Sequence, residues 1–476
     1  MEPALRPYQV DAVAAIRAAF ASRRRAPCYQ LPTGGGKTIV FSYIAREAAK
    51  RGTRVLILVH RRELLLQGSR ALQEVGLPHG LVAPTLPPTD AQVRIASVQT
   101  LVRRLDHVPP PDLLVIDEAH HAVAGSWRRV LERWPRARVL GVTATPARLD
   151  GKGLGVRVGG VFDHLVLGPS VQDLTDAGFL VPADVYAPPM KADLEGVRTR
   201  LGDFDRREIR VRMDRPVITG DAVEHYLRLA PGRPGIAFCA SVEHARHVAE
   251  AFSEAGVPSE PIDGGMGDGD RDGALARLAS GETRVLTSCE IVSEGFDLPA
   301  VEVAILLRPT QSLTLYLQQV GRVLRPSPGK ASATVLDHVG NVERHGLPDA
   351  DRTWDLDGVR RRRTGEAPVR RCPECFACHP PAPVCPACGH VYEVSPQRAG
   401  PQTVGGELQK VGRDRNHLFV EVQERMRLAH LEQARCRTFE DLVELGIRRG
   451  YGNPRAWARH VWRARHRTRS PAEASA

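Results

Sequence analysis

Two short strings that lie far apart in the chain constrain its fold most. The first, Pro32–Thr38, places three consecutive glycines and a lysine between an apolar stretch and a helix-forming stretch. The second, Asp117–His120, follows the continuous apolar run Leu113–Ile116, which is typical of a buried parallel strand. Because ligands bind at the carboxyl ends of strands in open α/β sheets, we expect both strings at one sheet edge.

The glycine-rich string has the chemistry of a phosphate-binding loop. Glycines let backbone N–H groups approach phosphate oxygens at a helix N-terminus, where bulkier residues would block the approach. Lys37 is expected to neutralise the β- and γ-phosphates, and the Thr38 hydroxyl to ligate Mg²⁺. The usual first glycine is replaced by Leu31, so a structural glycine turn is the alternative. The predicted nucleotide contacts in the loop are Thr33, Gly34, Gly35, Gly36, Lys37 and Thr38.

The acidic string is expected to complete this site. Asp117 would hold Mg²⁺ together with Thr38, and Glu118 would orient and deprotonate the attacking water. A solvated acidic turn is the alternative. The preceding apolar strand and the separate phosphate loop favour the catalytic interpretation, so the residues predict ATP hydrolysis with Mg²⁺.

A third string, Gln318–Arg325, follows a second series of apolar strands and helical stretches. Its two arginines, Arg322 and Arg325, lie three residues apart and therefore on one face of a helix. An arginine finger must come from outside the lobe that carries the phosphate loop, and this string meets that condition. We expect hydrolysis to open and close a cleft between two lobes. An ordinary solvated arginine pair is the alternative.

The set of motifs resembles the superfamily 2 helicases. The resemblance implies that Arg6 and Gln9 recognise adenine, that Thr143–Pro146 couples hydrolysis to movement, and that His120 joins the contacts between the lobes. The motifs that carry it are Leu5–Gln9, Val59–Leu64, Ser97–Thr100, Thr143–Pro146, Phe238–Ser241 and Glu294–Asp297. The resemblance also implies a catalytic role for Gln318, nucleotide contacts at Gly295 and Asp297, and nucleic-acid contacts at Arg61, Gln99, Thr100, Ser241 and Thr287.

Within this superfamily, the D-E-A-H string, the G-F-D motif and a cysteine cluster after the second lobe most resemble the bacterial RadD-type DNA repair helicases and related phage proteins. This resemblance implies a role in DNA repair or recombination, with DNA favoured over RNA. The alternatives are a duplex translocase or protein–DNA remodeller that does not separate strands, a non-catalytic DNA-binding adaptor, and a restriction-complex motor. The intact Lys37, Asp117 and Glu118 argue against the adaptor, and we find no nuclease or methyltransferase motif.

The resulting fold prediction is an α/β chain with two RecA-like, doubly wound parallel-sheet lobes in tandem, followed by a small zinc ribbon and a basic helical C-terminal region. The predicted domains are lobe one at 1–165, a connector at 166–215, lobe two at 216–345, a basic linker at 346–371, the zinc ribbon at 372–390 and the C-terminal region at 405–476.

Five of the nine cysteines lie between residues 372 and 388 and predict a metal site. Two C-P-x-C knuckles would each place two thiolates on one tetrahedral zinc ion. A metal is favoured over a disulfide, because a cytosolic chain stays reduced and so short a segment has almost no core. An accidental cluster or a redox pair is the alternative. The predicted ligands are Cys372, Cys375, Cys385 and Cys388, with Cys378, His379 and His390 as competing donors.

The formal net charge of +11 is concentrated in arginines at residues 358–371 and from Arg448 onward. Clustered arginine neutralises phosphates, so we expect these segments to bind nucleic acid; a flexible basic linker and tail are the alternative. A helix predicted to start at Asn453 and Pro454 would place Arg455, Arg459 and Arg463 on one face. A small DNA-binding module and a helical bundle docked on the motor both fit the tail.

The sequence also bears on location. No apolar run approaches the roughly 18 to 20 residues that a membrane span needs, and the first ten residues lack the charged and apolar regions of a signal peptide. We therefore expect a cytoplasmic protein with no membrane partner.

Overall fold

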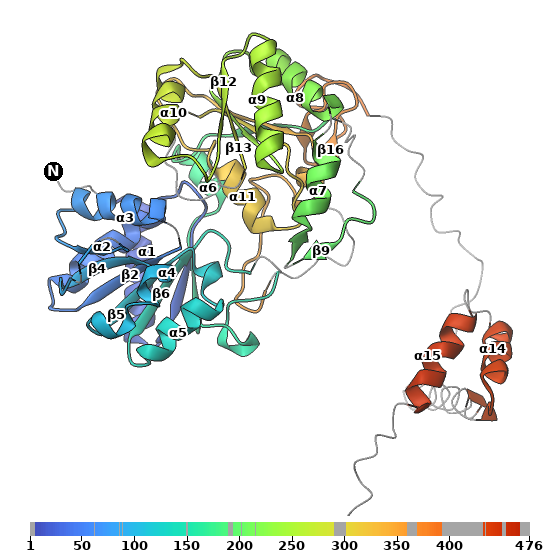
Figure 1. Ribbon diagram of the computed structural model, residues 1–476, viewed down its shortest axis with the longest axis horizontal. Helices are drawn as coiled ribbons and strands as arrows, with labels where there is room; N and C mark the ends of the chain where they lie inside the picture. Colours follow the sequence, from blue (N-terminus) through green and yellow to red (C-terminus); the bar gives the residue numbers. More distant parts are fainter. Residues whose placement is uncertain are drawn as a thin grey trace, which may run out of the picture. The chain divides into compact units, whose positions relative to one another are not determined.

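The computed structural model shows two parallel-sheet lobes and a pair of C-terminal helices (Figure 1). It describes residues 5–466 except 61, 85, 88, 149–150, 189–193, 201, 215, 290–300, 359–368, 393–431, 434 and 450–453. The chain divides into two compact units, Met1–Val394 and Ser395–Ala476. The first unit contains both lobes, and the second contains the C-terminal helices.

A seven-stranded sheet forms the first lobe, in the order β3-β4-β2-β5-β6-β1-β7 with parallel pairing throughout. Its strands are β1 (Pro27–Gln30), β2 (Val55–Val59), β3 (Gly80–Val82), β4 (Val93–Ser97), β5 (Leu113–Asp117), β6 (Arg138–Thr143) and β7 (His164–Leu167). In β2, Val55 and Ile57 join one apolar cluster, whereas Leu56 and Leu58 join another. Side chains alternate between the faces of a strand, so both faces of this sheet are buried.

Helices cover the two faces of the first sheet. Residues of α1, α2 and α3 belong to the cluster on one face, and residues of α4 and α5 belong to the cluster on the other. The helices are α1 (Pro7–Ala21), α2 (Lys37–Ala49), α3 (Arg62–Glu74), α4 (Val98–Leu101) and α5 (Gly125–Arg133), with 3-10 turns η1 (Leu105–His107), η2 (Ala119–His121) and η3 (Val156–Val158).

The second lobe has a six-stranded parallel sheet in the order β12-β13-β11-β14-β15-β8. Its strands, apart from β8, are β11 (Gly235–Phe238), β12 (Ser259–Ile262), β13 (Val285–Ser288), β14 (Val303–Leu306) and β15 (Ala333–Asp337). Its helices are α8 (Pro216–Leu229), α9 (Val242–Glu254), α10 (Asp268–Ser280), α11 (Leu313–Gly321) and α12 (Asn341–His345).

The stretch at 166–215, predicted as a connector, also completes the second sheet. Its strand β8 (Ala183–Tyr186) pairs with β15, whereas β7, which ends within the same stretch, pairs with β1 of the first lobe. The remaining elements are α6 (Val171–Asp176), the hairpin strands β9 (Thr199–Arg200) and β10 (Asp203–Phe204), and α7 (Arg206–Met213). This stretch is therefore both the link between the lobes and part of lobe two.

A cysteine-rich segment lies against the outer edge of the second sheet. It contains the short antiparallel strands β16 (Arg370–Arg371) and β17 (Cys378–His379). Ala377 forms an antiparallel bridge with Tyr186 of β8, and the Ala187 N–H donates to the Phe376 carbonyl at 3.0 Å. The segment therefore continues the sheet beyond its edge strand.

The second compact unit contains α14 (Phe439–Arg448) and α15 (Pro454–His466). The Thr438 hydroxyl caps α14 by accepting the Asp441 N–H at 3.1 Å. A Cβ on Gly446 would lie 3.1 Å from Pro454 and from Trp457, so the two helices are in close contact at this glycine. Helix α15 begins at Pro454, as predicted from the sequence.

The predicted fold class is confirmed: two parallel α/β lobes precede a four-cysteine cluster and C-terminal helices. None of the helices that the structure describes is long and apolar enough to span a bilayer.

Candidate functional site

The phosphate loop joins β1 to α2 through a turn that needs glycine. Gly34 and Gly36 have φ angles of 88° and 85°, which glycine adopts without a steric cost. The packing is equally tight, because a Cβ on Gly36 would lie 2.6 Å from Gln9 Nε2 and one on Gly35 would lie 2.7 Å from Leu31 Cγ. Gly36 is the N-cap of α2, so the loop ends at a helix N-terminus, where unpaired N–H groups favour phosphate.

The residues expected to recognise adenine lie against this loop. Gln9 is buried; its Oε1 accepts the Arg6 N–H at 2.9 Å, and its Nε2 lies 3.5 Å from the Gly35 carbonyl oxygen. The Tyr8 hydroxyl donates to the same carbonyl at 2.7 Å. The Arg6 guanidinium lies 4.6 Å from the centre of the Phe179 ring. The structure therefore brings Arg6 and Gln9 together at the phosphate loop.

Asp117 and Glu118 end β5 at the same edge of the sheet. Asp117 is buried, and its Oδ1 accepts the Glu118 N–H at 3.0 Å. Glu118 adopts a left-handed backbone conformation with φ 49°, which costs a non-glycine residue about 1–3 kcal/mol and is typical of functional sites. The sharp turn after the strand therefore fixes both carboxylates at the strand end.

Charges from both lobes act on the Lys37 ammonium. Burial lowers the pKa of Lys37, Glu118 and Asp117 oppose this shift, and Arg322 and Arg325 lower the pKa further. Such mutual effects require the groups to be close together. A Cβ on Gly34 would lie 3.4 Å from Arg325 Cγ, so the chain segment with the two arginines reaches the loop that carries Lys37.

Helix α11 positions the residues from the second lobe. Gln318 is buried, and its Nε2 has no hydrogen-bond partner among the described residues. Arg322 is the C-cap of α11 and is buried, and burial lowers the pKa of the Arg325 guanidinium. The lobes touch here, because a Cβ on Gly321 would lie 2.5 Å from the Thr33 Cβ. The end of α11 therefore packs directly on the phosphate loop.

A line of polar contacts leads from Glu118 to α11. His120 Nδ1 lies 3.3 Å from both Glu118 Oε2 and Thr143 Oγ1. The Thr143 hydroxyl donates to the Thr145 carbonyl at 3.0 Å. The Thr145 and Thr314 hydroxyls, which belong to different lobes, are 2.8 Å apart. The predicted water-activating residue is thus connected to the helix that precedes the two arginines.

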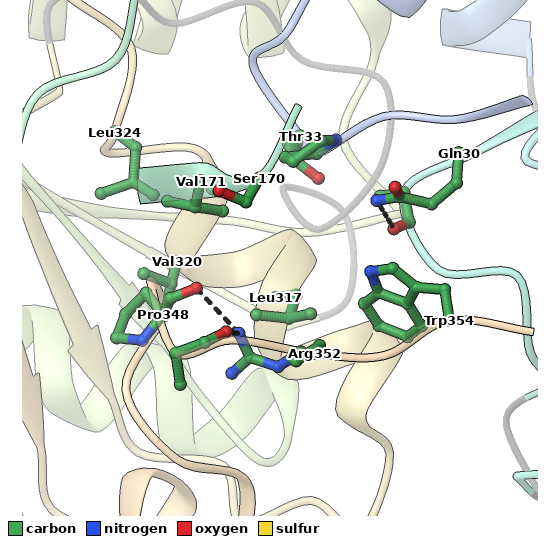
Figure 2. Close-up of a pocket in the computed structure, with 14 residues that line it drawn as sticks. Gln30, Thr33, Ser170, Val171, Leu317, Val320, Leu324, Pro348, Arg352 and Trp354 are labelled. Atoms are coloured by element: carbon green, nitrogen blue, oxygen red, sulfur yellow. Dashed lines mark hydrogen bonds between the residues drawn. The ribbon is translucent and has the colours of Figure 1, made fainter. Parts of the chain in front are cut away.

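A small cavity of about 50 Å³ lies between the lobes beside this site (Figure 2). Thr33 of the phosphate loop, Leu317 of α11 and Trp354 from the segment after lobe two are among its lining residues. Ligand pockets typically measure about 300–1,000 Å³, so this cavity is too small for a nucleotide. It marks a mainly apolar contact between the lobes next to the charged site.

The nucleic-acid contacts expected in lobe one differ in exposure. Gln99 is exposed at the start of α4, immediately after β4. Thr100 is buried, and its hydroxyl lies 2.9 Å from the Ser97 hydroxyl, which caps α4. Gln99 is therefore available to a ligand at the sheet edge, whereas Thr100 stabilises the local turn.

The contacts expected in lobe two also differ. Ser241 follows β11 and is the N-cap of α9, at the edge where strands end. Thr287 is fully buried in β13, and its hydroxyl donates to the Ala245 carbonyl at 2.6 Å. Helix α9 covers this strand, so the buried position argues against the predicted contact through the Thr287 side chain.

Other predicted residues cannot be placed in this geometry. Arg61, Gly295 and Asp297 lie outside the described residues, as does the side chain of Arg463. Arg455 and Arg459 are exposed on α15.

The four predicted zinc ligands come together in the cysteine-rich segment. Their Sγ atoms all lie within 4.8 Å of one another, and the pairs Cys372–Cys388 and Cys375–Cys385 are 3.6 Å and 3.8 Å apart. Tetrahedral zinc with bonds of about 2.3 Å requires sulfur atoms roughly 3.8 Å apart. The donor set therefore fits structural zinc. The competing donor His379 instead lies 2.7 Å from the Tyr392 hydroxyl through its Nε2.

We expect the purified chain to contain one zinc ion, measured by atomic absorption. Cys385→Ser should lose this metal, because it removes one of four thiolates, and should expose residues 370–392 to proteolysis. Cys378→Ser is the matched control, since Cys378 is buried nearby but lies outside the four-sulfur cluster. Equal zinc content in the two variants would contradict the assignment.

Sequence reasoning missed two contributors to the site. Thr314 contacts Thr145 of the other lobe through its hydroxyl, and Phe179 lies beside Arg6. Each is an ordinary residue in its local context, and its partner is distant in sequence. These two residues could have been predicted only from a knowledge of how the two lobes pack against each other.

Two family models match the chain over its two lobes. The type III restriction enzyme res subunit model matches residues 2–148, and the helicase conserved C-terminal domain model matches residues 220–327.

Relatives and a solved structure extend this similarity. A 51.5 kDa protein of Lactococcus phage (isolate 7-9) is 32% identical over 370 residues, which are 77% of this chain and 78% of the phage protein. IRC3 of Saccharomyces cerevisiae, named as an ATP-dependent helicase, is 30% identical over 71% of this chain and 52% of its own length. A fragment of an HsdR subunit of a type I restriction enzyme from Vibrio vulnificus YJ016 has the same fold, with a TM-score of 0.57, 21% identity and coverage of 72% and 67%.

The two lobes and the two family models define an enzyme of the helicase type. The chain belongs to the superfamily 2 helicases. It spans most of the phage protein but only about half of the yeast one. The narrower likeness to RadD-type proteins stays a prediction.

Proposed function

We propose that this protein is an ATP-dependent DNA helicase or translocase that acts in DNA repair or recombination. The observation that carries the proposal is the contact of the phosphate loop with the end of α11, where a Cβ on Gly321 would lie 2.5 Å from the Thr33 Cβ and one on Gly34 would lie 3.4 Å from Arg325 Cγ. A site divided between two lobes changes whenever the lobes move, and this is what a motor requires.

The residues present fit a nucleoside triphosphate with Mg²⁺. Thr38 and Asp117 offer the hydroxyl and carboxylate oxygens that Mg²⁺ prefers, and Lys37 with the glycine loop would hold the phosphates. Bound Mg²⁺ would supply neutralisation of phosphate charge. Gly295 and Asp297 remain proposed nucleotide contacts, and Gln318 a proposed catalytic one.

Glu118 is the proposed general base. Glu118 lies directly after β5 in a left-handed turn, and His120 Nδ1 lies 3.3 Å from its carboxylate, a contact that would orient the carboxylate towards an attacking water. Arg322 and Arg325 would stabilise the negative charge that develops on the transferred phosphoryl group. The Thr145–Thr314 contact would carry the resulting change to lobe two.

DNA is the proposed track. The likeness to RadD-type repair helicases supports this choice, and so does the match of lobe one to a restriction enzyme subunit. Ser241, Gln99 and Arg61 are the proposed contacts of the motor, and Arg455, Arg459 and Arg463 those of the tail. The proposed domain boundaries are those predicted from the sequence, with β8 included in lobe two.

The test is steady-state ATP hydrolysis with no polymer, single-stranded DNA, duplex DNA, forked DNA or RNA, each at two salt concentrations. We expect DNA to stimulate turnover more strongly than RNA does. Stimulation by RNA alone would overturn the DNA assignment, and a rate indifferent to every polymer would overturn the motor. Strand separation and protein displacement on the same forked DNA would distinguish a helicase from a translocase.

A further inference from the structure

Between β8 and α8 the chain carries residues that the nucleotide site does not use. We name residues 198–213 the basic insert; it comprises the β9–β10 hairpin and α7, with Leu201 outside the described residues. It contains six arginines and three acidic residues. Neither the helicase motifs nor the family models, which match residues 2–148 and 220–327, account for it.

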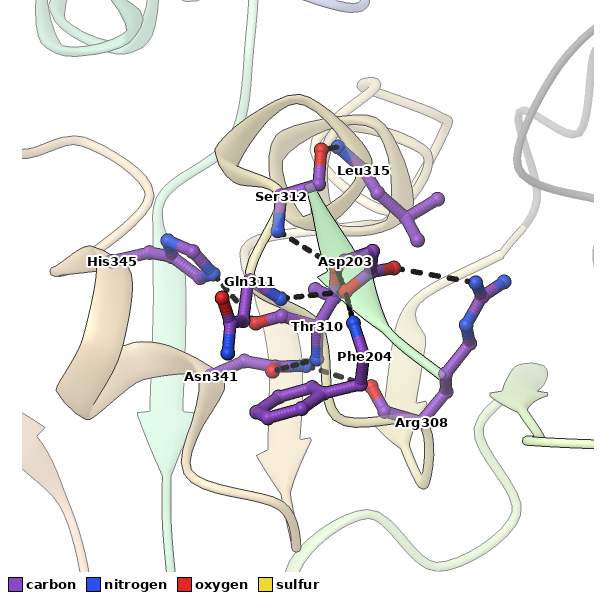
Figure 3. A network of polar contacts seen from close by, with 9 residues as sticks. All are labelled: Asp203, Phe204, Arg308, Thr310, Gln311, Ser312, Leu315, Asn341 and His345. Carbon is purple, nitrogen blue, oxygen red and sulfur yellow. Dashed lines mark hydrogen bonds and ion pairs between the residues drawn. The ribbon is translucent and has the colours of Figure 1, made fainter. Parts of the chain in front are cut away.

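The basic insert is held firmly on lobe two. Figure 3 shows the Asp203 carboxylate among groups of the segment that precedes α11. It accepts hydrogen bonds from the Gln311 N–H at 2.7 Å and the Thr310 hydroxyl at 2.9 Å, and it forms an ion pair with Arg308 at 3.4 Å. Ile209 and Met213 of α7 are buried. The insert is therefore a fixed surface of this lobe.

The acidic residues of the insert are engaged within the protein. Asp203 anchors the hairpin, and Asp205 caps α7 by accepting the Arg207 and Glu208 N–H groups at 3.0 Å and 3.3 Å. Glu208 is paired with Arg198. In contrast, the side chains of Arg200 and Arg207 are exposed and make no hydrogen bond or ion pair with another described residue. The insert thus presents positive charge outward.

The basic insert packs against α9, next to a proposed nucleic-acid contact. Arg210 of α7 forms an ion pair with Glu243 of α9 at 2.8 Å, and Asp214, just after α7, contacts His247 of α9 at 2.8 Å. Helix α9 begins directly after Ser241, the proposed nucleic-acid contact. The basic insert therefore borders the edge of lobe two at which the nucleic acid is expected to bind.

The exposed face of α7 is mixed in character. Val211 is 74% exposed, and it lies one helical turn after the exposed Arg207, next to Arg210. An apolar side chain between arginines can pack on sugar or base while its neighbours contact phosphates. This composition favours a polyanion with apolar surface.

We propose that the basic insert is a second nucleic-acid contact of lobe two, in which Arg200 and Arg207 bind the phosphate backbone beside Ser241. This inference rests on the proposed function, because it assigns a new surface to the same nucleic acid. It assigns the phosphate backbone to the two arginines, because an exposed guanidinium that makes no ion pair with a described residue can neutralise a phosphate of any sequence.

Two double variants test the proposal. Arg200→Glu with Arg207→Glu should leave the polymer-free ATPase unchanged and should raise the DNA concentration for half-maximal stimulation by about tenfold or more, because two phosphate contacts become repulsive. In the corresponding alanine pair, anisotropy titrations should show a slope of log affinity against log salt that is smaller by about 1.4–1.8. Arg200→Lys with Arg207→Lys should retain most of the DNA affinity, because it keeps both positive charges.

The matched control is Arg51→Glu with Arg136→Glu. Both arginines are exposed in loops that lead into β2 and β6, at the opposite edge of the first sheet. DNA binding that is equal for the wild type and the insert variants would overturn the proposal, as would an equal loss in the control pair. A wild type that binds DNA without stimulation would remove the motor but leave the insert testable by binding. A wild type that binds no nucleic acid would remove both, and a partner protein would then be the ligand of this surface.

Discussion

Replacing Lys37 with alanine is expected to abolish measurable ATP turnover. Lys37 is half-buried at the start of α2 and is the one cation that the phosphate loop 32–38 itself carries. Removing a single group that stabilises the transition state typically costs about 10²–10³ in rate. Since Lys37 would also contact the phosphates before reaction, ATP affinity should fall as well, measured with a fluorescent nucleotide.

The control for this variant is Lys50→Ala. Lys50 follows the same helix, is exposed, and pairs with Glu47 at 2.9 Å, a surface contact worth at most about 1 kcal/mol. The Lys50→Ala variant should hydrolyse ATP at the wild-type rate. Turnover that survives in Lys37→Ala would remove the basis for assigning the site.

Arg322→Ala is expected to lower ATP turnover strongly while leaving ATP binding intact. An arginine finger contributes about 10³–10⁵ to turnover, and it acts on charge that develops only during reaction. Turnover should therefore fall by this factor while ATP binding stays near the wild-type value, because the phosphate loop lies wholly in lobe one. Single-turnover hydrolysis together with nucleotide titration would separate the two quantities.

Arg246→Ala provides the comparison within lobe two. Its side chain lies on α9, is 58% exposed and pairs with Asp263 at 3.6 Å. It should leave turnover unchanged. If Arg322→Ala lost ATP binding and turnover equally, the arginine would be a binding group for the ground state rather than a stabiliser of the transition state.

Much of the fold could be predicted from local pattern. Runs such as Leu113–Ile116 are apolar on both faces, which is typical of a covered parallel strand, and the strings after them mark the sheet edge. The order of strands could not be predicted. β8 lies in a stretch that reads as a connector because its pairing partner, β15, is remote in the sequence.

The candidate site shows the same division. The phosphate loop can be predicted from the sequence, because the spacing of Gly34, Gly36 and Lys37 is that of a phosphate-binding motif. The solvent exposure of a side chain cannot be predicted in this way. The motif around Thr287 predicts a nucleic-acid contact, whereas packing under α9 buries this side chain. The anchoring of Asp203 likewise depends on two segments meeting in space.

Strand β8 is synthesised long before its pairing partner β15, which affects folding during translation. Residues 183–186 leave the ribosome well before β15 at 333–337, with which they pair. At about 5–20 residues per second, this strand waits roughly 7–30 s for its neighbour. Lobe one is complete by then, whereas the nascent second lobe carries an unpaired edge that can join other strands. During this interval both edges of β8 are open; β15 then pairs with one edge, and the cysteine-rich segment later covers the other.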